Sequence, residues 1–417
     1  MKQAGGWASL IAVLCLASPA AAQVTVLTHA TVIDGRGGAP QKDVTIVMEG
    51  GRIRDMGPSS RIRAPAGAAI ADLTGKFVVP GIINAHGHVS ANAVPELRQY
   101  ALYGITTAVS QGTDKGDVLV KIRREQQGGA VLGARVMTTL WRFEPNPVIA
   151  TPAQARAKVD ELVAQGADLI KVWVESLYGT RAKIAPEIRV AVLEQARKHG
   201  KITTAHIYEL ADAKMMIEAG LNVLAHNVRD REVDGEFIAL AKKRNVSLIP
   251  TLTRDEGLIA YAQPQAWINE PFFTKSVPPE RMDVLRTQVR AHQQNDPQSP
   301  LVRAGFEMNK INLKKMADAG VRIAFGTDSG GAPDRFFVQG YYEHREMELM
   351  VESGLTPMQV IQAFSRNSAE ALAIDKDYGT LARGKVADLL VLGKNPLDNI
   401  RNMRTIEAIY LGGRKFE

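Results

Sequence analysis

Cysteine is nearly absent from this chain of 417 residues. The only cysteine, Cys15, lies within the first 22 residues, so the rest of the chain has no disulfide to stabilise it. Its stability must come from burial of a core, which a chain of this length can supply. Tracts of biased composition are also missing, since 45% of the residues are hydrophobic and 23% are charged. Disorder, collagen and coiled coils are therefore excluded.

Blocks of like charge are missing as well. The net charge of +7 arises from 51 basic and 44 acidic residues, and these are scattered along the chain. Scattered basic residues do not make the footprint that nucleic-acid binding needs. We therefore expect no nucleic-acid partner.

Long apolar runs are absent except for one near the start, Trp7 to Ala17, which is too short to cross a bilayer as a membrane anchor. Pro19 and a stretch of small residues follow this run and end at Ala22. This order is typical of a secretory signal peptide over residues 1–22, cleaved after Ala22. We expect an exported, periplasmic protein with no stable membrane association after cleavage.

Short β-rich runs stand at both ends of the remaining chain. They are rich in alternating apolar residues and are broken by glycine and proline, which is typical of hairpins. The sequence therefore predicts one small β-sandwich domain built from both termini, residues 23–80 and 380–417. The runs are Val24–Asp34, Asp43–Met56, Ala69–Val79, Ala387–Leu392 and Ile406–Tyr410.

Residues 81–379 change to apolar runs that alternate with helical patterns. This alternation indicates repeated β/α units and a parallel sheet. Eight predicted strands make an α/β protein with a (β/α)8 TIM-type barrel the expected fold class. The predicted strands are Val78–Val89, Thr106–Gln111, Arg135–Thr139, Asp168–Glu175, Ile202–Ile207, Val223–Asn227, Val246–Leu252 and Arg322–Asp328.

Five polar side chains stand at the carboxyl ends of these predicted strands. His86 and His88 end the first strand as an HxH pair, and residues two apart on a strand point to the same side. His206, His226 and Asp328 end the fifth, sixth and eighth strands. A lone HxH pair would also suit two polar residues that cap a strand. Because a barrel gathers its functional groups at this end, the five are expected to converge on a metal site.

Lys171 lies within the fourth predicted strand, on one face with Leu169 and Trp173. Such an apolar setting favours the neutral amine. A neutral lysine amine can take up carbon dioxide to form a carbamate, whose two oxygens can bridge two cations. The alternative is a lysine that extends to the barrel mouth or pairs with a carboxylate such as Glu175. The residues alone leave both possibilities open.

With these features, the chain resembles the amidohydrolase superfamily, in particular its metal-dependent imidazolonepropionase- and prolidase-like branch. The resemblance covers nearly all of the chain after the signal segment, including Pro80–Gly81, Phe325–Ser329 and Gly384–Leu392. It implies a distorted (β/α)8 barrel beside a β-sandwich domain. It also implies a set of metal ligands, namely His86, His88, carboxylated Lys171, His206, His226 and Asp328.

The resemblance further implies a metal-dependent hydrolase that cleaves an amide bond in a small peptide or N-acyl amino acid. Two Zn2+ ions are expected, bridged by carboxylated Lys171 and a hydroxide, with Mn2+ or Fe2+ as other options. Asp328 is the expected catalytic residue, first as general base and then as general acid. One ion is assigned to His86, His88 and Asp328, and the other to His206 and His226.

Two other functions stay open at this point. One is a mononuclear, imidazolonepropionase-like hydrolase of cyclic amides in which Lys171 is an ordinary lysine; metal stoichiometry would separate it from the dinuclear enzyme. The other is a degenerate barrel that binds a ligand without catalysis, which the complete set of ligand positions disfavours. A homo-oligomer is compatible with either.

Four weaker candidates for substrate binding lie near the predicted strand ends. Tyr208 follows His206 by two residues, and Trp141 and Arg142 follow the third strand. His344 lies on a helical pattern after the eighth strand.

The connection 253–300 is too long for an ordinary loop of a barrel. It follows the seventh strand and so begins on the catalytic face. It carries Trp267, Phe272 and Phe273, which predicts a lid over the site with an apolar wall for the substrate. The alternatives are that these aromatic residues dock on the barrel's own helices or mediate a subunit contact.

Overall fold

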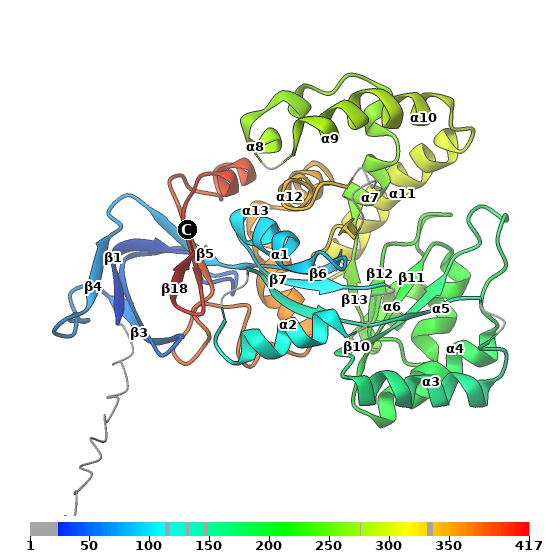
Figure 1. Ribbon diagram of the computed structural model, residues 1–417, viewed down its shortest axis with the longest axis horizontal. Helices are drawn as coiled ribbons and strands as arrows, with labels where there is room; N and C mark the ends of the chain where they lie inside the picture. The colour runs from blue at the N-terminus through cyan, green and yellow to red at the C-terminus, as the bar shows by residue number, and fades with distance from the viewer. Residues whose placement is uncertain are drawn as a thin grey trace, which may run out of the picture.

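The computed structural model describes residues 24–112, 117–130, 133–145, 148–275, 277–331 and 337–416. Strands from both ends of the chain form one eight-stranded sheet, in the order β18-β17-β16-β5-β1-β2-β3 with β4 beside β1. Ile53 and Leu389, from distant strands of this sheet, share one buried apolar cluster, so the sheet curls around its own core (Figure 1). The expected β domain from both termini is confirmed, with the faces of the sandwich joined in a single sheet. Its strands are β1 (Thr25–Val32), β2 (Gln41–Glu49), β3 (Arg52–Pro58), β4 (Ala69–Asp72), β5 (Phe77–Pro80), β16 (Leu389–Leu392), β17 (Ile406–Leu411) and β18 (Arg414–Phe416). The predicted signal segment lies outside the described residues.

The middle of the chain forms two parallel sheets, in the orders β15-β6-β7-β8 and β14-β13-β12-β11-β10-β9. Their strands are short and largely buried; all six residues of β10 are buried, as expected for strands covered on both faces. The strands are β6 (Ile82–His88), β7 (Ile105–Ser110), β8 (Arg135–Thr138), β9 (Arg142–Phe143), β10 (Leu169–Val174), β11 (Ile202–Ile207), β12 (Val223–Ala225), β13 (Ser247–Ile249), β14 (Arg322–Ile323) and β15 (Ser329–Gly330).

The two sheets are the two arcs of a distorted barrel. The predicted third strand corresponds to β8, and the predicted eighth begins with β14. A break separates β8 from β9 and another separates β14 from β15, and both β9 and β15 lie beyond the predicted strand ends. Near the second break, Ala324 donates its N–H to Leu248 of one arc, and Phe325 accepts from Ala85 of the other. The arcs therefore stay joined through this segment, and the predicted distorted (β/α)8 barrel is confirmed.

Helices connect the strands and cover the outside of the barrel (Figure 1). The start of α3 has a capping box in which the side chains of Thr151 and Gln154 satisfy backbone N–H groups. Gly166, at φ 98°, ends the same helix. The connecting helices are α1 (Ala93–Leu102), α2 (Val118–Gln127), α3 (Pro152–Gln165), α4 (Pro186–Lys198), α5 (Leu210–Glu218), α6 (Gly235–Lys243), α12 (Tyr341–Glu352), α13 (Pro357–Gln362) and α14 (Ser368–Ala371).

The long connection after β13 folds into a helical layer of its own. In Figure 1 its helices α8, α9 and α10 lie across the top of the molecule, above α12. The layer ends in the long helix α11, which returns the chain to β14. Its helices are α7 (Leu252–Gly257), α8 (Pro271–Thr274), α9 (Pro279–Val284), α10 (Arg290–Asn295) and α11 (Ser299–Asp318).

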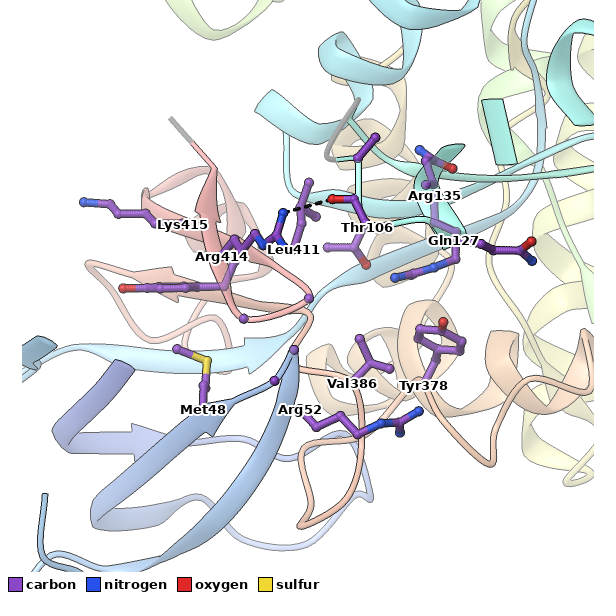
Figure 2. A pocket seen from close by; sticks show the side chains of 18 of the residues that line it. Met48, Arg52, Thr106, Gln127, Arg135, Tyr378, Val386, Leu411, Arg414 and Lys415 are labelled. Carbon is purple, nitrogen blue, oxygen red and sulfur yellow. Dashed lines mark hydrogen bonds between the residues drawn. The ribbon is translucent and has the colours of Figure 1, made fainter. Parts of the chain in front are cut away.

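A cavity of about 1370 Å3 separates the β domain from the amino-terminal ends of the barrel strands. Figure 2 shows Arg52, Arg135 and Tyr378 around it. Both arginines are engaged in ion pairs, with Asp377 and Asp388. Arg135 is the first residue of β8, so this cavity lies at the amino-terminal end of the barrel. Barrels carry their chemistry at the opposite, carboxyl-terminal end. Within the described residues, no helix is both long and apolar enough to span a bilayer.

Candidate metal centre

The five strand-end residues converge as the barrel geometry predicts. His88 Nε2 lies 2.6 Å from Asp328 Oδ1, and His86 Nε2 lies 3.4 Å from the same oxygen. The ring centroid of His226 is 4.7 Å from that of His86 and 4.1 Å from that of His206. Residues up to 242 positions apart in sequence therefore meet at one point.

Three of these residues form a group with the spacing of metal ligands. His86, His226 and Asp328 each offer one ligand atom, and these atoms lie within 4.8 Å of one another. The group takes members from both of the ligand sets that the resemblance assigns to separate ions. His88 contacts the group through Asp328, and His206 through the ring of His226.

The protonation states suit a cation. Burial lowers the pKa of His86 to about 3 and that of His206 to about 4, and holds the pKa of His226 well below its usual value. Burial alone would raise the pKa of Asp328, but hydrogen bonds from His86 and His88 outweigh it and hold that pKa well below its usual range. Neutral imidazoles and an ionised carboxylate are the forms in which these groups bind metals.

Hydrogen bonding leaves one nitrogen of His226 available. Its Nδ1 lies 2.5 Å from Thr251 Oγ1, and this hydroxyl donates to the carbonyl oxygen of Pro250 at 2.8 Å. The hydroxyl must then accept from Nδ1–H, so Nε2 carries the free lone pair. Among the described residues, neither His226 Nε2 nor His86 Nδ1 has a hydrogen-bond partner, although both are buried. A buried unpartnered polar atom costs about 1–3 kcal/mol, and the residues therefore fit a divalent cation.

Lys171 is buried beside this group, with 2% of its surface exposed. Burial lowers the pKa of its amine to about 7, and Nζ donates to Gln111 Oε1 at 3.0 Å. Glu175 is paired with Nε2 of His206 instead, and no ion pair between Lys171 and Glu175 occurs in the described residues. Gln111 and Glu175 were not predicted as site residues, although both directly follow barrel strands.

Three residues around the centre have backbone torsions that residues other than glycine rarely adopt. The φ angles are 74° at His226, 48° at Thr251 and 61° at Asp328. Such conformations cost of the order of 1–3 kcal/mol each and persist only where the surroundings hold them. His226 directly follows β12, Thr251 lies two residues beyond β13, and Asp328 directly precedes β15.

A cavity of about 360 Å3 opens over the centre. Of the weaker substrate-binding candidates, Arg142 lines it, whereas Tyr208, Trp141 and His344 do not. His344 Nε2 contacts the carbonyl oxygen of Tyr103 and the ring is buried, so this residue faces away from the cavity. The lining residues are His86, His88, Gln111, Arg142, Lys171, Trp173, His206, Arg254, Leu258, Asp328 and Phe337.

The aromatic residues of the 253–300 insertion do not cover the site. Trp267 stacks on Tyr341 with ring centroids 5.3 Å apart, and Phe273 packs edge-on against the same ring at 4.8 Å. Phe272 contacts His344 at 4.8 Å. These aromatic residues dock on α12, one of the barrel's own helices, and the prediction that they form the wall against the substrate is wrong. The insertion contributes Arg254 and Leu258 to the cavity instead.

Leu258→Ala and Phe273→Ala are therefore expected to differ in kind. Truncation of Leu258 removes part of the cavity wall and should change relative kcat/KM about tenfold between substrates with large and small side chains. Phe273 is fully buried, and its truncation should lower the free energy of unfolding by about 3–5 kcal/mol while leaving relative kcat/KM unchanged. Steady-state kinetics and urea unfolding measure both effects. A specificity change in Phe273→Ala would return the aromatic residues to the substrate wall.

The fold and the site together define a class of protein: a β/α barrel with imidazole, amine and carboxylate groups gathered at the carboxyl ends of its strands. The chain belongs to the amidohydrolase family, whose sequence model matches residues 77–415. The predicted superfamily and its prolidase-like branch are confirmed.

Individual relatives are distant. An ochratoxinase of Aspergillus niger is 24% identical over 337 residues, which cover 76% of this chain and 60% of that protein. The chain thus spans about 60% of the length of this curated relative. Among solved structures, a Bifidobacterium longum protein assigned as a prolidase is 25% identical, with a TM-score of 0.77 and 95% of each chain covered. A Xaa-Pro dipeptidase with bound methionine is 22% identical, also with a TM-score of 0.77, and the match covers 95% of this chain and 100% of that one.

Proposed function

We propose that this protein is an exported metal-dependent amidohydrolase that cleaves the amide bond of a small peptide or an N-acyl amino acid. One observation carries the proposal: His86, His226 and Asp328 bring three ligand atoms within 4.8 Å at the mouth of the barrel. Lys171, His88 and the cavity of about 360 Å3 lie beside them. Family membership and the prolidase and ochratoxinase relatives support a hydrolytic reaction at a carbon–nitrogen bond.

The residues around the centre have different proposed roles in binding the cation, transferring the proton and binding the substrate. His86, His88, His206, His226 and Asp328 would hold one or two divalent cations, Zn2+ being our first choice for nitrogen and oxygen ligands. A bound cation polarises a carbonyl oxygen and lowers the pKa of water. Asp328 is ionised and buried next to this point, so it can accept the proton of the attacking water and donate it to the leaving nitrogen. Arg142 and Arg254 line the same cavity and offer guanidinium donors to a polar group of the substrate.

Lys171 is proposed to be carboxylated. The uncharged amine nitrogen attacks carbon dioxide, a C–N bond forms, and one proton leaves for solvent, which leaves a carbamate anion. Burial favours the neutral amine that this step needs, and the anion would offset the charge of two cations. The competing proposal is a mononuclear hydrolase of cyclic amides, in which Lys171 keeps its amine.

Lys171→Ala tests the carbamate. We expect the variant to lose about one metal ion per chain, because a bridging ligand is removed, and to lose most of its turnover. A short carboxylic acid at high concentration should restore part of both. Metal analysis and kinetics measure the result, with the exposed Lys121→Ala as control. Two bound ions and normal turnover in Lys171→Ala would refute the assignment.

The substrate class is tested by a screen of dipeptides, N-acyl amino acids, lactams and aryl esters with the metal-loaded protein. The proposal expects the highest kcat/KM among linear amides. A preference for lactams, together with one ion per chain, would favour the mononuclear alternative.

Export is proposed from residues 1–22 alone. When the full chain is expressed in a bacterial host, the protein recovered from the periplasm is expected to begin at Gln23, because signal peptidase cleaves after a small residue such as Ala22. Amino-terminal sequencing checks this. A cytoplasmic product that retains residues 1–22 would contradict it.

A further inference from the structure

Helix α12 carries two buried carboxylates that face the metal-centre loops. Glu343 and Glu346 are both 0% exposed, and residues three apart share one face of a helix. No ion pair with either carboxylate occurs in the described part of the chain; their partners are neutral donors. Burial raises the pKa of both groups. Burial of such carboxyl groups costs free energy unless they are hydrogen-bonded, so their hydrogen-bond partners are part of what holds this region together.

Glu343 holds the segment that carries Asp328. Its Oε1 accepts from Thr327 Oγ1 at 2.8 Å and from Ser329 Oγ at 2.5 Å, the two hydroxyls that flank Asp328. The same oxygen accepts from Asn84 Nδ2 at 2.7 Å. Asn84 in turn accepts the backbone N–H of His86 at 3.1 Å. One oxygen of Glu343 thus links the hydroxyls on either side of Asp328 to Asn84, which binds the backbone of His86.

Glu346 holds the next loop in the same way. Its oxygens accept the backbone N–H of Leu252 at 2.9 Å and that of Thr253 at 2.7 Å, and also Thr253 Oγ1 at 2.7 Å. These residues directly follow Thr251, whose hydroxyl contacts His226 Nδ1. Thr253 Oγ1 also lies 3.3 Å from the carbonyl oxygen of Thr327, which links the two loops.

Both carboxylates therefore act where the backbone is strained. Asp328 at φ 61° lies between two residues that Glu343 binds, and Thr251 at φ 48° immediately precedes the two N–H groups that Glu346 binds. A left-handed threonine is unusual because its side chain is β-branched. The carboxylates are the groups on α12 that satisfy the donors these turns expose.

We propose that Glu343 and Glu346 are positioning residues that hold the loops of Asp328 and Thr251 in their strained form and so preorganise His86, His226 and Asp328 for a divalent cation. This inference rests on the proposed metal centre. His344, on the same helix, contacts the carbonyl oxygen of Tyr103, whereas Glu343 and Glu346 bind the two loops.

The test is the affinity of the metal-free protein for Zn2+, measured by competition with a chromogenic chelator. Partners of metal ligands typically contribute 10- to 100-fold in metal affinity. Glu343→Gln and Glu346→Gln are expected to raise the Kd for Zn2+ by about that factor, because each amide replaces one acceptor oxygen by a donor. Glu352→Gln, on the exposed part of the same helix, should stay within about twofold.

Unfolding of the metal-free variants in urea separates positioning from simple stability. Positioning is supported if the Kd rises in variants that still unfold cooperatively. An unchanged Kd beside a lowered midpoint would overturn it, and failure of the wild type to bind Zn2+ would refute the proposed metal centre itself.

If either glutamine variant does not fold, Ser329→Ala and Thr253→Val replace it. Each deletes one donor to a carboxylate and adds no buried polar group. Loss of one hydrogen bond should raise the Kd about 2- to 10-fold. No change in either of these variants would overturn the proposal.

Discussion

Amide hydrolysis is expected to fall by about three orders of magnitude or more when divalent metal is removed with a chelator. A cation supplies several kcal/mol of transition-state stabilisation, and each 1.36 kcal/mol corresponds to a factor of ten in rate. The structure adds a second effect. A buried imidazole nitrogen of the group, His226 Nε2, has no hydrogen-bond partner in the described residues, so loss of an ion that satisfies this atom should also lower Tm.

Reconstitution is the control for this experiment. Once the chelator has been removed by dialysis, added Zn2+ should restore both turnover and Tm, whereas Mg2+ should not, because it prefers oxygen ligands. Full activity in protein shown by elemental analysis to be free of metal would disprove the proposed mechanism.

Asp328→Asn is expected to keep much of its bound metal and to lose about 10²- to 10⁴-fold in kcat, the usual effect of removing a general acid or base. The backbone should not change, because asparagine tolerates the left-handed region that Asp328 adopts at φ 61°. The side chain keeps its shape and one oxygen, but it no longer accepts a proton. Metal analysis and kinetics on the same preparation measure the two effects separately.

Asn84→Ala is a useful comparison for Asp328→Asn. Asn84 contacts the loop of Asp328 through Thr327 and Glu343 but does not touch the cavity. The Asn84→Ala variant should weaken metal binding more than it lowers kcat of the metal-saturated enzyme.

Wild-type kcat in Asp328→Asn with metal content intact would show that another group transfers the proton.

The strand ends were the part of the site that the sequence predicted best. His86, His88, His206, His226 and Asp328 were placed by one rule, that parallel strands of a barrel finish on the same face, and the structure brings them together. The rule applies because such side chains are positioned by the backbone of the sheet and not by their neighbours in sequence. Lys171 was predicted differently, from alternation within a strand, and that strand is buried throughout.

Residues that act through another element were harder to predict. Glu343 and Glu346 lie in a helix with several charged residues, a pattern that usually belongs to a solvated face. They are buried because they bind loops that are distant in sequence, at Ser329 and Thr253. The sequence predicted a substrate-binding role for His344 on that helix. One residue further along a helix faces a different direction, and His344 contacts Tyr103 instead. The prediction for the aromatic residues of the insertion failed for a related reason, because their apolar partners, such as Tyr341, are distant in sequence.

Anomalous diffraction at the zinc edge, from crystals of the Zn2+-loaded protein, tests the central claim most directly. The account predicts a peak about 2.0–2.2 Å from nitrogens of His86 and His226 and an oxygen of Asp328. A second peak on the other side of Lys171 would establish the dinuclear form. The absence of any peak among these residues in fully loaded crystals would contradict the account.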